Sequence, residues 1–357
     1  MRILVDRHIP WVQELFGSRG ELVFFDRTPP PDLARAEALL VRSTLKINAQ
    51  LFSQHQPRFV GTATAGTDHL DLPYLAAQGI RVASAPGCNG LAVAQWVIAG
   101  LVILKGTDLK GLRLGIVGLG QVGRRLAALG QALGMEVRAN DPPAQAQGQT
   151  GPWETLEDLL GWAEVVSLHV PWTTEGPFPT YSLLDHKKLA LLRPGALLVN
   201  SCRGGVVEES ALLELLPKLC PPVIDTWAGE PQINRRLLNQ TGLASPHVAG
   251  YSEEAKAKGT WAIAQAFGEW LGLPPLPGPP FLPPLEVTVG PSPAVFLAQI
   301  TGIDRDNRAL KAGGDFAQLR NQYPFRREWQ SVHLQGVGQL PLSQQHFYRS
   351  LGFVLPP

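Results

Sequence analysis

The sequence predicts an α/β fold in which one domain is inserted into another and a smaller domain follows. Three observations lead to this prediction. Short apolar runs alternate with polar or helix-forming stretches as far as about residue 245, the pattern of parallel sheets covered by helices. A glycine-rich turn at 115–123 interrupts that alternation. A proline-dense stretch at 273–284 then separates the C-terminal segment, because proline removes backbone donors and stiffens the chain.

The N-terminal segment contains the strands of the first expected sheet. None of its turns has a nucleotide-binding motif. An apolar helix follows over 92–104, too short to span a bilayer. The expected strands of this segment are 3–5, 22–25, 39–41, 59–62 and 80–83.

A second sheet is expected between this helix and residue 245. A long helix over 253–271 comes next, and its acidic start suits a helix N-terminus. The expected strands of the second sheet are 114–117, 135–139, 165–170, 196–199 and 223–224.

The glycine-rich turn reads G-I-V-G-L-G-Q-V-G and follows directly on an apolar run. Gly118, Gly120 and Gly123 fit the G-x-G-x-x-G pattern, and residues 124–133 can continue as a helix. In this pattern the glycines permit a tight turn, a close approach of pyrophosphate and close packing of helix on strand. Asp141 follows the next apolar run, where an acid accepts hydrogen bonds from a ribose diol and repels a 2′-phosphate. The turn therefore predicts a dinucleotide site that favours NAD over NADP.

Composition narrows the class of protein. The 45% hydrophobic content and formal net charge of +1 describe a globular chain and give no support for binding nucleic acid or a membrane surface. The cysteines, Cys88, Cys202 and Cys220, form neither a zinc-ligand pattern nor a disulfide framework, so no metal site is expected. The start M-R-I-L-V-D carries no signal-peptide pattern. These observations predict a cytoplasmic protein.

Three polar side chains follow expected strand ends of the second sheet, the edge at which ligands bind in such folds. Arg203, in N-S-C-R-G-G, can hold a carboxylate or polarise a carbonyl. Glu230, in A-G-E-P, and His247, in S-P-H-V-A-G-Y, can act together, because a carboxylate beside an imidazole orients the ring and stabilises its protonated form. An arginine, a glutamate and a histidine after a dinucleotide motif form the set needed to oxidise a 2-hydroxy acid.

The order of these motifs resembles the D-isomer-specific 2-hydroxyacid dehydrogenases. More narrowly, the chain is similar to the branch of that family that oxidises 4-phospho-D-erythronate at C2 during vitamin B6 biosynthesis. The likeness covers almost the whole chain, and the C-terminal G-G-D-F-A-Q-L-R-N-Q-Y-P-F-R-R-E-W is its most discriminating part. The other matching motifs are I-L-V-D, V-R-S with Lys46, F-V-G-T-A-T-A-G-T-D-H, A-P-G-C-N, D-P-P, S-C-R-G, G-E-P, P-H-V-A-G-Y and the late L-G-F.

The resemblance implies a Rossmann-type NAD-binding domain inserted in a flavodoxin-like substrate domain, plus a small C-terminal α+β dimerisation domain. Residues 1–90 and 250–275 would form the substrate domain, and residues 91–249 the NAD-binding domain. Residues 276–284 would be a proline-rich linker, and residues 285–357 would hold a homodimer together. The active site would be the cleft between the first two domains.

The resemblance also assigns site residues. Arg203 and Glu230 would be active-site residues, and His247 would transfer the proton. Substrate contacts are implied at Ser43, Thr64 and Tyr251. From their chemistry, Arg42 and Lys46 are further candidates for the phosphate, and the N–H groups at Ala65 and Gly66 for the carboxylate. Cofactor contacts beyond the glycines are implied at Gln121, Val122, Asp141, Val170, Asp225 and Gly250.

Two positions depart from the family pattern, and two other functions stay open. Gln95 stands where a glutamate is expected, which puts a charge-based role for that helix position in doubt, and Val170 stands where a threonine is expected. One alternative is another dehydrogenase of the family, acting on 3-phosphoglycerate or glycerate. The other is a dinucleotide-sensing interaction protein without turnover. Comparing NADH formation with 4-phospho-D-erythronate, 3-phosphoglycerate and glycerate separates the three hypotheses.

Overall fold

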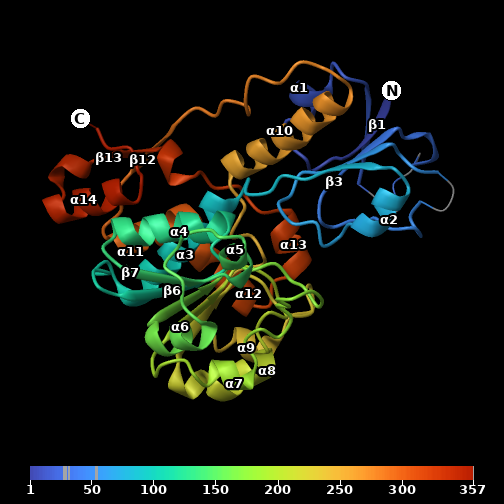
Figure 1. Ribbon diagram of the computed structural model, residues 1–357. Helices are drawn as coiled ribbons and strands as arrows, with labels where there is room; N and C mark the ends of the chain where they lie inside the picture. Colours follow the sequence, from blue (N-terminus) through green and yellow to red (C-terminus); the bar gives the residue numbers. More distant parts are fainter. Residues whose placement is uncertain (27–29, 31–32, 53–54, 357) are drawn as a thin grey trace. The chain divides into compact units, whose positions relative to one another are not determined.

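The chain folds into two compact units, and each is built from two separate stretches of sequence (Figure 1). The computed structural model describes residues 1–26, 30, 33–52 and 55–356. The first unit comprises Met1–Asn89 and Ser252–Leu282, and the second comprises Gly90–Tyr251 and Pro283–Pro357. Within the described residues, no helix is long and apolar enough to cross a membrane.

The first unit is built on a parallel sheet of five strands in the order β2-β1-β3-β4-β5, the flavodoxin-like order. Every strand expected in this segment is present. The strands are β1 (Arg2–Asp6), β2 (Glu21–Phe25), β3 (Ala38–Val41), β4 (Phe59–Thr62) and β5 (Arg81–Ala83).

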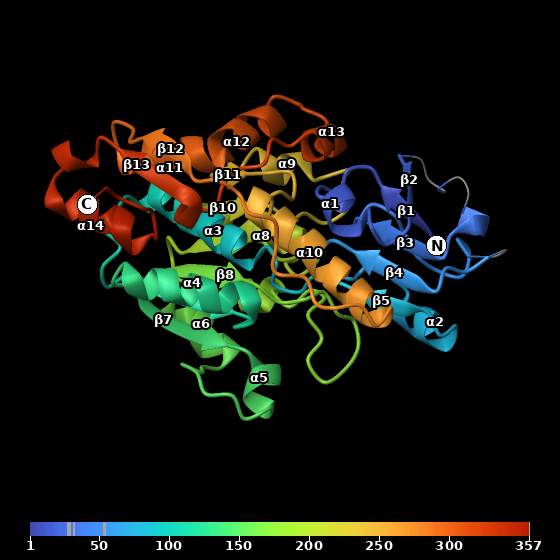
Figure 2. The same ribbon diagram turned by 90° about the horizontal axis from the view of Figure 1, so that it is seen from above.

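Helices cover both faces of this sheet. The long helix α10 (Glu253–Trp270) returns to the first unit and packs with α1 (Val12–Phe16) on one face (Figure 2). The rings of Phe59 and Phe267 meet edge to face there, with centroids 5.0 Å apart. The short helix α2 (Leu72–Ala77) contributes to the cluster on the opposite face. The buried contact between Phe59 and Phe267 therefore joins residues that are far apart in the sequence into one core.

The second unit contains a parallel sheet of six strands in the order β11-β10-β9-β8-β6-β7. The chain moves to one side from β6 to β7 and then crosses to β8 on the other side. In open α/β sheets, ligands bind outside the carboxyl ends of the strands at such a reversal. The strands are β6 (Arg113–Val117), β7 (Glu136–Asn140), β8 (Val165–Leu168), β9 (Leu197–Asn200), β10 (Cys220–Ile224) and β11 (Leu243–Ala244).

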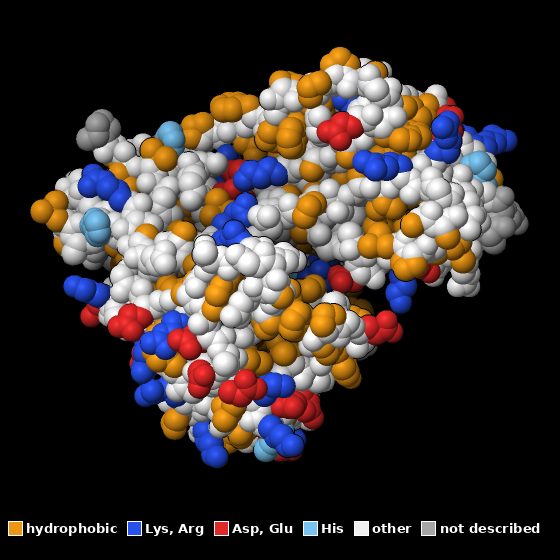
Figure 3. All heavy atoms as spheres, in the orientation of Figure 1, with side chains coloured by type: hydrophobic (Ala, Val, Ile, Leu, Met, Phe, Trp, Pro, Cys, Tyr) orange, Lys and Arg blue, Asp and Glu red, His pale blue; other side chains and the backbone are white. Residues whose placement is uncertain are grey.

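The helices of this unit lie on both sides of the sheet. On one side α3 (Gly90–Lys105) and α4 (Gln121–Ala132) pack together, and α3 is apolar on nearly its whole circumference because it is buried. Basic and acidic side chains are interspersed where α6, α7 and α8 reach the surface drawn in Figure 3, so neither charge dominates there. The other helices of the inserted stretch are α5 (Pro142–Ala146), α6 (Leu156–Trp162), α7 (His186–Leu189), α8 (Glu209–Leu215) and α9 (Arg235–Leu238).

The C-terminal segment belongs to the same compact unit as the inserted stretch. Most of its buried apolar side chains, among them Phe296 and Trp329, share one cluster with α3, whereas Leu310 and Phe316 belong to a second cluster. A two-stranded parallel pair and four helices make up the segment. They are β12 (Leu285–Thr288), α11 (Pro293–Thr301), α12 (Ile303–Lys311), α13 (Phe316–Asn321), β13 (Val332–Gln335) and α14 (Leu342–Ser350). A separate dimerisation domain over 285–357 stays a prediction.

The contacts of Gln95 explain why this position departs from the family pattern. Its side chain is 1% exposed and lies where α3 meets the C-terminal segment. Its amide nitrogen donates to Gln330 Oε1 at 2.9 Å, and its amide oxygen accepts from the Trp329 backbone N–H at 3.3 Å. A neutral amide satisfies both partners without burying a charge, so this position joins two stretches of the chain.

Candidate active site

The glycine-rich turn connects β6 to α4, and two of the three glycines in its G-x-G-x-x-G pattern have a steric reason to be glycine. Gly118 adopts a φ of 92°, and a Cβ there would come within 2.7 Å of the His169 carbonyl oxygen. A Cβ on Gly123 would collide with the carbonyl of Gly118. Around Gly120, in contrast, no described atom lies within 4 Å of a built Cβ. The turn is therefore closed behind Gly118 and Gly123 and open at Gly120, as pyrophosphate binding requires.

Asp141 follows β7 and fixes the end of that strand to the glycine turn. Its Oδ2 accepts the backbone N–H of Leu119 at 2.8 Å. Its Oδ1 accepts the N–H of Ala144 at 3.0 Å and caps α5. The carboxylate thus has a structural role, and its remaining lone pairs are available to a ribose diol.

A pocket of about 990 Å³ opens at the carboxyl ends of the strands of this unit. Gly118, Gly120, Asp141 and Val170 line it, as the sequence predicted for cofactor contacts. The helix α4 begins at Gln121 and Val122, directly after Gly120. Gln121, Val122, Gly123, Asp225 and Gly250 are outside the described residues that line the pocket, so their cofactor contacts stay predictions.

The pocket also contains residues that the sequence analysis did not single out. His169 follows β8, and its Nε2 lies 2.9 Å from the Ser167 hydroxyl. Burial lowers the pKa of His169 to about 3, so the ring is neutral at physiological pH. Trp153 and Phe178 add apolar surface to the same wall. An apolar pocket with an open glycine turn and an acid fits an adenine dinucleotide.

Glu230 and His247 are in direct contact. Glu230 follows β10 and His247 follows β11, and these are adjacent strands. The distance from His247 Nδ1 to Glu230 Oε2 is 2.8 Å, and Glu230 Oε1 accepts the Trp227 N–H at 2.9 Å. Burial alone would raise the pKa of Glu230, but the hydrogen bond and charge of His247, with Trp227 and Arg320, lower it. An ionised carboxylate thus orients the imidazole.

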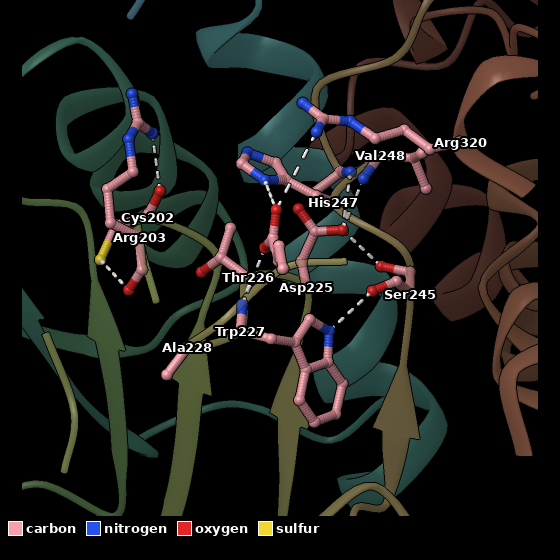
Figure 4. Close-up of polar contacts among 12 residues, drawn as sticks. Cys202, Arg203, Asp225, Thr226, Trp227, Ala228, Ser245, His247, Val248 and Arg320 are labelled. Carbon is pink, nitrogen blue, oxygen red and sulfur yellow. Dashed lines mark hydrogen bonds and ion pairs between the residues drawn. The ribbon is translucent and has the colours of Figure 1, made fainter. Parts of the chain in front are cut away.

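Asp225, at the end of β10, holds the segment that carries His247. The side chain is 2% exposed, and its Oδ1 accepts from the Ser245 hydroxyl at 2.5 Å, the Val248 N–H at 2.7 Å and the Ala249 N–H at 3.1 Å (Figure 4). Burial raises the pKa of Asp225 against the effect of these donors and of His247. The backbone of His247 has a φ of 58°, unusual for a residue with a side chain, and these bonds hold it there.

Arg203 follows β9, the next strand of the same sheet, and Figure 4 shows it apart from His247. Its Nη1 donates to the Cys202 carbonyl at 2.7 Å. Asn200, which the sequence analysis did not consider, holds this turn: its Nδ2 donates to the Arg203 carbonyl at 3.1 Å. Burial raises the pKa of Cys202 to about 11, so the thiol is protonated and is no nucleophile.

Tyr251 ends the stretch that contains His247, and the C-terminal segment holds its side chain. The phenol oxygen accepts from Arg320 Nε at 3.3 Å. The ring also meets those of Tyr323 and Phe325, with centroids 5.8 and 6.2 Å away. These contacts place Tyr251 in the second unit, together with Arg203, Glu230 and His247.

The remaining candidates belong to the first unit, at the carboxyl ends of adjacent strands. Arg42 follows β3, and its Nε donates to Asp6 Oδ2, at the end of β1, at 2.9 Å. Ser43 and Lys46 are exposed in the turn that follows. Asp6 fixes the orientation of the Arg42 guanidinium, as an anion site requires.

The turn after β4 carries the other candidates of this unit. The Thr64 hydroxyl donates to the Gly66 carbonyl at 3.0 Å and lies 2.8 Å from the Thr62 hydroxyl. The Thr62 hydroxyl in turn lies 3.0 Å from His69 Nε2. Ala65 and Gly66 are thereby held in one conformation. A role for their N–H groups in binding a carboxylate stays a prediction.

Comparison with known proteins agrees with this geometry. Residues 92–249 match the family model described as the NAD binding domain of D-isomer specific 2-hydroxyacid dehydrogenases. The chain is 39% identical to erythronate-4-phosphate dehydrogenases of Shigella flexneri serotype 5b and Escherichia coli O1:K1, over 94% of this chain and 94% of each relative.

Solved structures share the fold over most of the chain. The TT0316 protein of Thermus thermophilus is 27% identical with a TM-score of 0.66, and the match covers 79% of this chain and all of that one. A D-lactate dehydrogenase of Aquifex aeolicus, complexed with NAD and lactic acid, is 22% identical with a TM-score of 0.65, over 76% of this chain and 96% of that one. By its sequence, its NAD-binding domain and its fold, the chain belongs to the erythronate-4-phosphate dehydrogenase family of D-isomer-specific 2-hydroxyacid dehydrogenases.

Proposed function

We propose that this protein oxidises 4-phospho-D-erythronate at C2 to 3-hydroxy-2-oxo-4-phosphooxybutanoate with NAD, a step of vitamin B6 biosynthesis. The observation that carries the proposal is the 2.8 Å contact between Glu230 and His247, in the same unit as the open glycine turn. Its relatives are named for this substrate. A fixed imidazole–carboxylate pair in a dinucleotide-binding unit is suited to the oxidation of an alcohol.

Proton transfer falls to His247. The pocket lined by Gly118, Gly120 and Asp141 would hold NAD, which would supply the hydride acceptor for C2. Because Nδ1 faces Glu230, the other ring nitrogen of His247, Nε2, takes the hydroxyl proton as the C2 carbonyl forms. Glu230 stabilises the imidazolium that results. The alcohol thus loses its hydroxyl proton to the histidine and its C2 hydrogen, with the bonding electron pair, to the cofactor.

We assign substrate binding to the remaining candidate residues. A planar guanidinium holds a carboxylate or a developing carbonyl, and we assign this task to Arg203. Backbone N–H groups at Ala65 and Gly66 would bind the same carboxylate. For the phosphate we assign Arg42, Ser43, Lys46 and Tyr251. The ion pair between Arg42 and Asp6 supports this assignment, because it orients the guanidinium.

Turnover with several acids tests the proposal. We expect NADH formation with 4-phospho-D-erythronate, and a kcat/KM at least about a hundredfold lower with unphosphorylated erythronate, whose binding leaves polar groups unpaired. A 2-oxo acid acceptor should be present in case NADH release limits the rate. Equal rates with erythronate and its phosphate refute the substrate assignment, and preference for 3-phosphoglycerate or glycerate favours the first alternative. Binding of NAD without turnover of any 2-hydroxy acid favours the sensing protein.

We also propose that the protein is a homodimer held together by its C-terminal segment. Several large apolar side chains of this segment are exposed, including Leu342 at 80%, Val295 at 44% and Leu285 at 41%. Exposed apolar side chains mark a surface that a partner covers where they form one contiguous patch. Light scattering at micromolar concentration measures the mass directly.

A further inference from the structure

The C-terminal segment brings a partly buried cation to the catalytic pair. Arg320 lies on α13, and its side chain is only 20% exposed. Its Nη1 is 3.9 Å from Glu230 Oε2, and Figure 4 shows its guanidinium beside His247. Its Nε donates to the Tyr251 phenol at 3.3 Å. Nothing in the assignment of Arg203, Glu230 and His247 calls for a second arginine at this place.

The position of this cation is specific, because it contacts the same carboxylate oxygen as the imidazole. His247 Nδ1 and Arg320 Nη1 lie 2.8 and 3.9 Å from Glu230 Oε2. The two nitrogens are therefore no more than about 7 Å apart, a separation at which charges interact strongly in a partly buried site. The other carboxylate oxygen is held by the Trp227 N–H, so Glu230 cannot turn away from either partner.

Three carboxyl groups and a second arginine lie near the imidazole of His247. Glu230 contacts the ring directly, and Asp225 acts on it from the end of β10. Glu209, whose side chain accepts the Ala228 N–H at 2.8 Å, lies near Glu230, and Tyr251 contributes a phenol. The buried Arg326 donates to the backbone carbonyls of Val248 and Ala249, which follow His247 in the chain. A carboxylate in contact with an imidazole favours the protonated ring, whereas oxidation of an alcohol needs a neutral imidazole that can accept a proton.

We propose that Arg320 is a positioning residue that keeps His247 a competent base by offsetting part of the negative charge of Glu230. Its cation opposes protonation of the ring and is itself held in place by Tyr251. The C-terminal segment thereby takes part in catalysis, in addition to any role in assembly. This inference rests on the proposed function, because it concerns the base in that reaction.

The pH dependence of kcat/KM tests the inference. Replacing Arg320 by Gln removes the charge, so protonation of His247 becomes easier. We expect the acid limb of the profile to move to higher pH by roughly 0.5 to 1.5 units. Arg320→Lys keeps the charge and should leave the limb close to that of the wild type. Arg308→Gln is the matched control, because that arginine is on α12, pairs with Asp304 and is 74% exposed.

A readout without turnover separates this inference from the proposed function. The imidazole of His247 can be titrated by NMR in the NAD-bound protein, and its midpoint should rise in Arg320→Gln relative to the wild type. Arg320→Met gives the same comparison if the glutamine variant does not fold. An unchanged midpoint and acid limb, even with lower activity, would show that Arg320 is only structural. A wild type that does not oxidise 4-phospho-D-erythronate refutes the proposed function, while the titration still decides the role of Arg320.

Discussion

Cofactor choice depends on Asp141, and two substitutions there separate its electrostatic role from its structural one. Asp141→Asn removes the charge, keeps one side-chain oxygen and preserves a residue type that caps helices as well as aspartate does. Asp141→Ala removes both the charge and the two hydrogen bonds, to Leu119 and Ala144. A change in cofactor preference that both variants share therefore reports the lost charge, and a difference between them reports the lost hydrogen bonds.

The expected magnitudes follow from these contacts. Loss of the α5 cap costs about 1 kcal/mol, and an orphaned Leu119 N–H costs about 1–3 kcal/mol, so Asp141→Ala should lower the free energy of unfolding by about 2–4 kcal/mol. Asp141→Asn should cost about 1–3 kcal/mol, because its single side-chain oxygen can keep only one of these two N–H donors. Unit charges 4 Å apart interact by about 1 kcal/mol in water and about 4 kcal/mol near a protein surface. Repulsion of a 2′-phosphate in this range corresponds to a preference for NAD of roughly fivefold to a thousandfold.

The assay is kcat/KM for NAD and for NADP with 4-phospho-D-erythronate, combined with thermal unfolding of each variant. We expect the wild type to prefer NAD, and Asp141→Asn to narrow the preference by about fivefold or more with a smaller loss of stability than Asp141→Ala. If the wild type uses both cofactors equally, or if the asparagine variant keeps the full preference, the carboxylate does not select the cofactor.

Three further outcomes are expected. His247→Asn should lower turnover by roughly a hundredfold or more while NAD still binds, because asparagine tolerates the positive φ of this position but cannot act as the base. For His169, the folded-state pKa of about 3 lies below the unfolded value of 6.5, so its contribution to stability is complete above pH 6.5 and is lost as the pH falls toward 3. Between pH 7 and 4.5, the free energy of unfolding in urea should accordingly decrease less in His169→Gln than in the wild type. A chain that ends at Leu282 lacks Phe296 and the rest of the C-terminal segment packed on α3, so it should expose apolar surface, bind a hydrophobic dye and lose the dimer.

Each of these outcomes has a result that contradicts it. Turnover of His247→Asn at the wild-type rate means that another group accepts the proton. If the free energy of unfolding decreases equally in His169→Gln and the wild type between pH 7 and 4.5, this ring is not buried and neutral in solution. A full-length protein that is monomeric at micromolar concentration rules out the proposed dimer.

The local parts of the fold and site could be predicted from the sequence. Apolar runs of strand length indicate the strands. The G-x-G-x-x-G pattern indicates the conformation of the glycine turn, because Gly118 and Gly123 leave no room for a Cβ. Residues that follow parallel strands share one edge of a sheet, which is why Glu230 and His247 could be expected near each other.

Contacts between distant stretches could not be predicted in this way. Gln95 looks like a departure from a family pattern until its partners Gln330 and Trp329, far along the chain, are known. Arg320 lies in a motif that identifies the family but carries no local sign of its partner Glu230. A cofactor contact of Asp225 stays a prediction, and the sequence did not show that its side chain also accepts three hydrogen bonds that hold the histidine segment. Local sequence patterns predict backbone conformation and burial, whereas these contacts depend on which distant stretches of the chain pack together.

The interleaving of the two units has a consequence for how the protein is made. As the chain leaves the ribosome, the first unit becomes complete only when α10 and the following residues up to Leu282 have emerged. The second unit, which begins at Gly90, must wait for Pro283–Pro357, whose buried side chains finish the core around α3. At synthesis rates of about 5–20 residues per second, that wait after Leu282 is roughly 4 to 15 s. During this interval the nascent chain holds a complete first unit and an unfinished second unit with an uncovered apolar helix, the form that chaperones most readily recognise.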